Sequence, residues 1–159
     1  MLVGEQPGND EDLAGRPFVG PAGRVLDAAL AEAGIERAKV FITNAVKHFK
    51  FVPRGKRRLH QRPNAEEIDA CRVWYESERR LVRPRLIVAL GGSAARAVFG
   101  KAMTIAQARG RIHDLPGGGH AAVTIHPSFL LRLRDPADKA RQRRLFVGDL
   151  RRAGAFVAA

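Results

Sequence analysis

Short apolar runs alternate along this chain with longer segments in which apolar residues recur every three to four positions. The short runs predict buried β-strands, and the periodic segments predict amphipathic helices. The expected strands are residues 1–4, 40–43, 86–90 and 121–125. The expected helices are residues 21–33, residues 64–82, a short segment ending at residue 98, and residues 136–152. Asn64 is a suitable N-cap for the second of these helices.

The order of these elements predicts the architecture. Strands that alternate with helices and are apolar on both faces are typical of a parallel sheet covered on both sides. We therefore expect an α/β fold with three layers, α/β/α, around a central four-stranded parallel sheet, forming one domain over residues 1–159. In such sheets the ligand binds beyond the carboxyl ends of the strands. Polar or glycine-containing segments follow all four strands: GEQPG, TNAVKH, LGGS and IHPS.

Composition narrows the class of protein. The chain is 45% hydrophobic and 28% charged, as in soluble globular proteins. It has no apolar run of membrane-spanning length and no recognisable secretion signal, so we expect a cytoplasmic protein without a membrane partner. Its one cysteine, Cys71, excludes a disulfide within the chain and fits a reducing compartment.

Positive charge is concentrated in residues 47–62 and again in residues 132–152 of a chain whose net charge is +12. Between Lys47 and Arg62 there are seven Lys or Arg, two His and no acidic residue. We expect a basic loop inserted at about residues 47–63, with His60 at its tip. Such a segment lacks internal counter-charges and favours a polyanionic partner. Two interpretations remain open here: a solvated loop that binds nucleic acid loosely, and a loop with a specific role.

Three motifs in this order resemble those of the iron–sulfur (family 4) uracil-DNA glycosylases. The first comprises Gly4-Glu5-Gln6-Pro7-Gly8, then Glu11-Asp12, Gly15, Pro17-Phe18-Val19-Gly20 and Ala22-Gly23. The second is Thr43-Asn44-Ala45-Val46-Lys47, and the third is His126-Pro127-Ser128-Phe129-Leu130. Lys56-Arg57-Arg58-Leu59-His60 resembles the loop that distinguishes the UdgX-type members, although their loop has isoleucine where Leu59 stands. Those enzymes become covalently attached to the DNA from which they remove uracil. The resemblance implies a monomeric enzyme of base excision repair that acts on uracil in single- or double-stranded DNA and associates with the nucleoid through DNA.

The resemblance implies roles in base recognition for Phe18, Asn44 and Gly4. A glycosylase must take its base out of the stack and bind its edge. Phe18 would stack on the flipped uracil; the alternative is a core phenylalanine. The carboxamide of Asn44 can both donate to and accept from the uracil edge; the alternative is a turn or cap residue.

The same motifs supply candidates for the chemistry. Glu5 could stabilise an oxocarbenium-like sugar or orient a nucleophile, or could be a buried structural acceptor. Gln6 is neutral and better suited to positioning a water or the base. His126 would donate a hydrogen bond to uracil O2 as negative charge develops on the leaving base, and Ser128 would bind a nearby phosphate.

The resemblance makes His60 the nucleophile that attacks the sugar C1′ after uracil departs. Imidazole can do this only in its neutral form, with a free ring nitrogen aimed at the carbon. Arg58 would help to hold the loop. Lys56, Arg57, Arg58, Arg132 and Arg134 are the expected DNA-binding cations.

The metal site of the family is incomplete in this sequence. Relatives hold an iron–sulfur cluster with an N-terminal CxxC pair and two later ligands. Cys71 matches a later cysteine, His48 stands where relatives have cysteine, and no CxxC pair is present. Because a cluster normally needs four ligands, we expect no cofactor in this chain, with Cys71 and His48 as candidate ligands only if a CxxC segment precedes Met1.

Three functions therefore remain to be compared. The first is a uracil-DNA glycosylase that is captured through His60. The second is a glycosylase that turns over by activating water near Glu5 or Gln6. The third is a module that only binds uracil-containing or single-stranded DNA.

Overall fold

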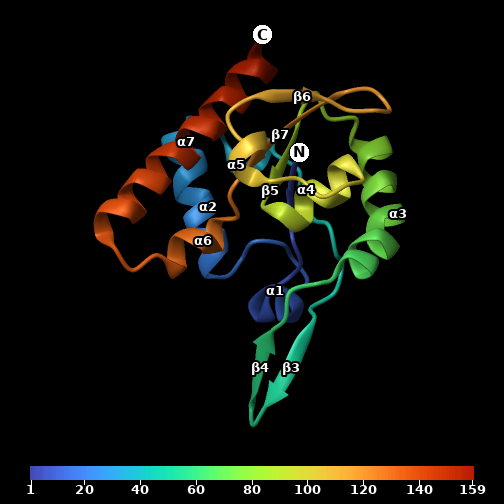
Figure 1. Ribbon diagram of the computed structural model, residues 1–159, viewed down its shortest axis with the longest axis vertical. Coiled ribbons are helices and arrows are strands. Elements are labelled where there is room, and N and C mark those ends of the chain that lie inside the picture. Colours follow the sequence, from blue (N-terminus) through green and yellow to red (C-terminus); the bar gives the residue numbers. More distant parts are fainter.

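A five-stranded sheet forms the centre of the computed structural model, which describes residues 1–159 (Figure 1). Its strand order is β2-β1-β5-β7-β6. The elements in chain order are β1 (Leu2–Gly4), α1 (Asn9–Ala14), α2 (Pro21–Glu32), η1 (Arg37–Lys39), β2 (Ile42–Asn44), β3 (Phe51–Arg54), β4 (Arg57–His60), α3 (Ala65–Val82), β5 (Ile87–Leu90), α4 (Gly92–Phe99), α5 (Ile105–Ala108), β6 (Ile112–Asp114), β7 (His120–Thr124), α6 (Pro127–Arg132) and α7 (Pro136–Ala158).

The sheet confirms the predicted α/β class and corrects the number of strands. β2, β1, β5 and β7 are parallel, as expected, but β6 adds a fifth, antiparallel strand beside β7. The sequence pattern missed β6 because Ile112-His113-Asp114 has a single apolar residue and pairs at the edge of the sheet. The sheet is therefore mixed, and its four-stranded core is parallel.

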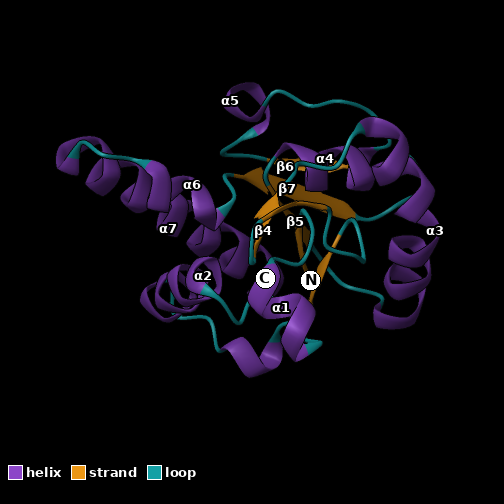
Figure 2. Ribbon diagram, turned by 90° about the horizontal axis from the view of Figure 1, so that it is seen from below, coloured by secondary structure: helices purple, strands orange, loops and turns teal.

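Helices cover both faces of the sheet (Figure 2). α3 and α4 lie on one face, and α2, α6 and α7 lie on the other. β5 shows how the faces divide: Ile87 and Ala89 join the apolar cluster under α3 and α4, whereas Val88 and Leu90 join the cluster under α2 and α7. Since successive side chains of a strand point to opposite faces, an all-apolar strand fits a sheet buried on both sides.

The helix boundaries follow from local chemistry. The Asn64 side chain accepts a hydrogen bond from the Glu67 amide, and the Glu67 carboxylate accepts one from the Asn64 amide, so α3 begins with the expected N-cap. α7 continues six residues beyond the predicted end at Arg152, with Ala153 buried and Phe156 packed against the core. No helix is both long and apolar enough to cross a membrane.

The basic insertion is a two-stranded hairpin, β3–β4, that projects from the body beside α1 (Figure 1). Its turn is at Gly55, whose φ of 57° lies in the left-handed region that glycine favours. His60 pairs with Phe51 at the base of the hairpin. The prediction that His60 stands at the tip of the loop is therefore wrong: antiparallel pairing brings the last residue of β4 back beside the first residue of β3.

Candidate active site

The carboxyl ends of the parallel strands open into one cleft of about 1110 Å³. The segments after β1, β2, β5 and β7 all contribute to its lining, as the sequence predicts for a parallel sheet. The base of the hairpin closes one side through His60. The cleft therefore gathers eight of the candidate residues from distant parts of the sequence: Glu5, Gln6, Phe18, Asn44, His60, His126, Ser128 and Arg132.

Phe18 and Asn44 form the deep part of the cleft. Phe18 is 5% exposed, and its φ of 54° is unusual for a residue with a side chain. The Asn44 Oδ1 atom is buried and has no hydrogen-bond partner. A Cβ built on Gly4 would lie 2.4 Å from that oxygen and 2.6 Å from the Phe18 ring, so only glycine fits between them. The arrangement leaves an aromatic face and an unpaired acceptor beside each other.

Glu11 holds the turn that carries Phe18. Its Oε1 accepts hydrogen bonds from the amides of Val19 and Gly20 at 3.1 and 2.8 Å, and its Oε2 accepts one from Gly8 at 3.1 Å. One carboxylate therefore ties the turn after β1 to the turn after α1. The resemblance placed Glu11 in the first motif without giving it a function, because its partners are backbone amides, which no residue type reveals.

The hydrogen bonds of His126 define its tautomer. The backbone amide of Ser128 can only donate, and it lies 3.1 Å from His126 Nδ1. Nδ1 is therefore the acceptor, the Ser128 hydroxyl at 2.8 Å also donates to it, and the ring proton resides on Nε2. Burial lowers the pKa of His126 to about 4, so the ring is neutral at physiological pH. A neutral Nε2–H donor is thereby available to the cleft.

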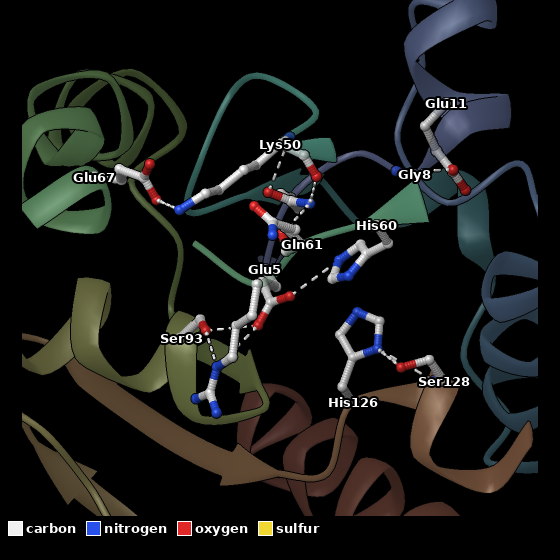
Figure 3. A network of polar contacts seen from close by, with 12 residues as sticks. Glu5, Gly8, Glu11, Lys50, His60, Gln61, Glu67, Ser93, His126 and Ser128 are labelled. Carbon is white, nitrogen blue, oxygen red and sulfur yellow. Dashed lines mark hydrogen bonds and ion pairs between the residues drawn. The ribbon is translucent and has the colours of Figure 1, made fainter. Parts of the chain in front are cut away.

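Glu5 and His60 face each other across the mouth of the cleft (Figure 3). His60 Nε2 lies 3.3 Å from Glu5 Oε1, and the His60 side chain is about half exposed. Glu5 lies at the end of β1, whereas His60 comes from the base of the hairpin. The hairpin thus brings an accessible imidazole next to a carboxylate, and its second ring nitrogen makes no hydrogen bond within the chain.

Glu5 is held ionised by its surroundings. Burial raises the pKa of this carboxyl, but hydrogen bonds from His60 and Ser93, together with attraction to positive charge on His60 and His126, bring the pKa below its usual value. Ser93 Oγ donates to Glu5 Oε2 at 2.6 Å, and Arg62 Nε lies 3.6 Å from the same oxygen. Sequence reasoning identified neither partner, although the LGGS turn containing Ser93 was expected at this edge.

Gln6 clamps the base of the hairpin. Its Nε2 donates to the carbonyls of Lys50 and Gln61 at 3.2 and 3.0 Å, and its Oε1 accepts from the Lys50 amide at 3.3 Å. Lys50 and Gln61 directly flank β3 and β4, so one buried amide joins both strands to the turn after β1. The position of Gln6 by itself did not predict this role; its proposed role in placing a water or the base stays a prediction.

The sequence of this chain matches a known protein family over nearly its whole length. Residues 1–151 match the family described as the uracil DNA glycosylase superfamily. The chain belongs to this superfamily. It is 39% identical over 158 residues to the Type-4 uracil-DNA glycosylase of Thermotoga maritima, covering 99% of this chain and 77% of that protein. It is 38% identical over 139 residues to the protein of the same name from Pyrobaculum aerophilum, covering 83% of this chain and 67% of that protein.

The similarity to these relatives identifies the chain as a family 4-like member of the uracil-DNA glycosylase superfamily.

The iron–sulfur cluster that the resemblance implies would need four ligands, and the chain can be examined for them. Cys71 Sγ and His48 Nδ1 lie 4.0 Å apart, and no group of three or more His, Cys, Asp or Glu could hold a metal ion. Because such a cluster normally needs four ligands, these two residues do not fit it on their own.

The predicted DNA-binding cations of this superfamily member fall into two sets. Lys56 and Arg57 are exposed near the hairpin turn, and Arg132 and Arg134 are exposed beside the cleft. Arg58 instead contacts the body: its Nη1 lies 2.6 Å from Asp12 Oδ2, its Nε donates to Asn9, and its guanidinium stacks 5.1 Å from the Phe49 and Phe51 ring centres. In this arrangement Arg58 holds the hairpin against α1.

Proposed function

We propose that this protein excises uracil from DNA and is then captured on it, through a covalent bond between His60 and the deoxyribose C1′. The family match and its Type-4 relatives support the excision. The observation that supports capture is the position of His60, whose Nε2 lies 3.3 Å from Glu5 Oε1 at the mouth of the cleft containing Phe18, Asn44 and His126.

Recognition would use the unpaired groups of the deep cleft. The flipped uracil stacks on Phe18, and the buried Oδ1 of Asn44 accepts the uracil N3–H, which supplies the partner that this oxygen lacks. A base without a donor at that position leaves the oxygen desolvated and unpaired. The cleft therefore favours uracil over cytosine, whose N3 carries no proton.

Excision would be assisted by His126 and Glu5. As the bond between uracil N1 and C1′ breaks, its electron pair leaves with the base, and the neutral His126 Nε2–H donates to uracil O2. The ionised Glu5 carboxylate stabilises the positive charge that develops on the sugar. His126 therefore stabilises the negative charge on the leaving uracil, and Glu5 stabilises the positive charge on the sugar.

Capture would follow at the same carbon. Glu5 accepts a hydrogen bond from the proton-bearing nitrogen of neutral His60, which leaves the lone pair of the other ring nitrogen to form the bond to C1′. As the bond from uracil N1 to C1′ breaks and the bond from nitrogen to C1′ forms, uracil departs as the anion. The product is an N-alkylated imidazolium whose remaining N–H stays hydrogen-bonded to the ionised Glu5 carboxylate. No oxidant, reductant or further reactant is needed.

A turnover glycosylase is the second candidate function. Glu5 at the cleft mouth could instead deprotonate a water that attacks C1′, and this mechanism needs no contribution from His60. The two mechanisms share recognition and excision. They differ only in whether nitrogen or oxygen is bonded to C1′ at the end.

An oligonucleotide with one uracil, labelled at its 5′ end and run on a denaturing gel, tests the proposal. For the unmodified protein we expect a heat- and detergent-resistant band of lower mobility in stoichiometric amount. For His60→Ala we expect no such band, and an abasic site that alkali cleaves. The matched control is His120→Ala, which removes an exposed histidine outside the cleft and should leave the shifted band unchanged.

Each other outcome contradicts part of the proposal. Alkali-labile product without a shifted band from the unmodified protein would establish turnover. If the unmodified protein gave neither an abasic product nor a shifted band, DNA binding would be the one function left of the three. An undiminished band in His60→Ala would move the nucleophile to another residue.

A further inference from the structure

The turn between β5 and α4 contacts both catalytic sides of the cleft. A Cβ built on Gly91, whose φ is 95°, would lie 3.1 Å from the Cβ of His126. Two residues later, Ser93 is 2% exposed and its hydroxyl donates to Glu5 Oε2 at 2.6 Å. Residues 91–93 therefore lie beside His126 and hydrogen-bond through Ser93 to the Glu5 carboxylate, a hydrogen bond that Figure 3 shows.

Ser93 leaves Glu5 with one free oxygen. A carboxylate without this hydrogen bond can rotate and present either oxygen to His60. With Oε2 bound to the Ser93 hydroxyl, Oε1 is directed at His60 Nε2, 3.3 Å away. Arg62 Nε lies 3.4 Å from Ser93 Oγ as a donor, which leaves the single hydroxyl proton for Glu5.

We infer that Ser93 is a positioning residue for Glu5: its buried hydroxyl binds one carboxylate oxygen and orients the other toward His60. Ser93 does not contact the reacting atoms. It acts through Glu5, because a hydrogen bond donated to a carboxylate favours the charged form. This inference deepens the proposed function and rests on it for the identity of the reacting groups.

Three other ionisable groups lie close enough to Glu5 to affect the pKa of its carboxyl. His60 faces it from β4, Arg62 from the segment after β4, and His126 from the start of α6. All three favour the ionised carboxylate when they carry positive charge. Ser93 is uncharged, so its removal changes the carboxylate without removing a charge from the site.

The test combines a spectroscopic readout with the rate of capture. The ¹³C carboxyl resonance of Glu5 is titrated in the unmodified protein, in Ser93→Ala and in the matched pair Ser93→Thr and Ser93→Val. These two variants have nearly the same shape and differ in the hydroxyl. We expect the Glu5 midpoint to move to higher pH in Ser93→Ala and Ser93→Val, and to move less in Ser93→Thr. Thermal unfolding of each variant identifies any loss of folding.

The rate of adduct formation at neutral pH should fall about ten- to a hundredfold in Ser93→Ala, the effect of one hydrogen bond to a charged group. Ser93→Thr should retain more of the rate than Ser93→Val. An unmoved Glu5 midpoint in Ser93→Ala overturns the inference, and so does equal behaviour of the matched pair. If the unmodified protein forms no adduct, the proposed capture fails, while the titration still decides the role of Ser93.

Discussion

At the scale of single residues, the cleft contains polar atoms that the folded chain does not pair. The Oδ1 atom of Asn44 is buried beside Phe18 without a hydrogen-bond partner. An unsatisfied buried acceptor costs on the order of 1–3 kcal/mol, and a bound uracil would remove this cost. An unpaired acceptor of this kind is what a binding site that trades stability for ligand affinity would contain.

Replacing Asn44 by leucine should therefore have opposite effects on stability and activity. We expect the free energy of unfolding to stay within about 1 kcal/mol of the unmodified protein or to rise, because the unpaired oxygen is gone. Uracil release should fall at least about a hundredfold in Asn44→Leu, because the base edge loses its partner. Urea unfolding and a single-turnover release assay provide the two measurements. A large loss of stability would show that Asn44 is mainly structural.

A second prediction concerns the titration of His126. Its pKa of about 4 in the folded protein lies below the ordinary value near 6.5, so the unfolded chain takes up the proton first as the pH falls. Stability relative to His126→Gln should be full above pH 6.5 and decline by about 2 kcal/mol toward pH 4, after allowance for partial exposure. NMR titration of the ring protons gives the pKa directly. A midpoint near 6.5 would contradict the proposed buried, neutral donor.

The sequence identified some site residues and missed others for a physical reason. Phe18, Asn44 and His126 were recognisable because their residue types and motifs are tied to chemistry, and the structure brings them into one cleft. Glu11 and Ser93 act through backbone amides or through a carboxylate 88 positions away. Such interactions depend on how turns pack, which a local pattern does not contain.

At the scale of elements, the hairpin depends on a few attachments. Arg58 ties it to Asp12 of α1, Lys50 pairs with Glu67 at the start of α3, and Gln6 joins the backbone on both sides of its base. No apolar core of its own supports it, because its strand residues are exposed or half-buried. The direction in which His60 points therefore depends on these polar interactions.

Because Gln6 holds the base of the hairpin, we expect its removal to slow the reaction only when His60 is present. In Gln6→Ala, we expect adduct formation to slow about tenfold, since the base of the hairpin loses its hydrogen bonds to the turn after β1. In a His60→Ala background, the same change should leave uracil release within about twofold, because the hairpin then carries no nucleophile. The comparison uses the four combinations of the two substitutions. An equal fall in the rate of uracil release on Gln6→Ala in both backgrounds would instead support a role for Gln6 in positioning water or the base.

The elements themselves were predictable to different degrees. β5 and α3 follow from an apolar run and from a capped amphipathic segment, and both were expected within one residue. α1 has no buried residue and β6 has one apolar residue, so neither leaves a periodic signal. The hairpin was expected only as a loop, because its exposed strands lack alternation between apolar and polar positions.

At the scale of the whole molecule, the exposed cations predicted to bind DNA lie in two separate places. The hairpin projects beyond the body (Figure 1), and the exposed Lys56 and Arg57 lie at its turn. A second set of exposed cations comprises Arg132, which lines the cleft, and Arg134. The acidic residues of α1 are partly engaged by Arg58 and by backbone amides. A DNA strand bound across the cleft would therefore contact cations on both sides of it.

Salt dependence tests this separation. Removing one cation that binds a phosphate should reduce the slope of log Kobs against log salt by about 0.7 for single-stranded DNA. We expect Lys56→Ala/Arg57→Ala to lower the slope by about 1.4, twice that amount. Arg80→Ala/Lys101→Ala removes the same charge from exposed positions outside the cleft and should leave the slope unchanged. Equal reductions in both double variants would indicate diffuse attraction by net charge.

The proposed covalent bond between His60 and the sugar is tested most directly by mass spectrometry of the adduct. The adduct with a uracil-containing oligonucleotide is digested with nuclease and protease, and the peptides are fragmented. We expect a deoxyribose phosphate remnant on His60 alone. A remnant on any other residue, or none on a protein that releases uracil, would contradict capture through this histidine.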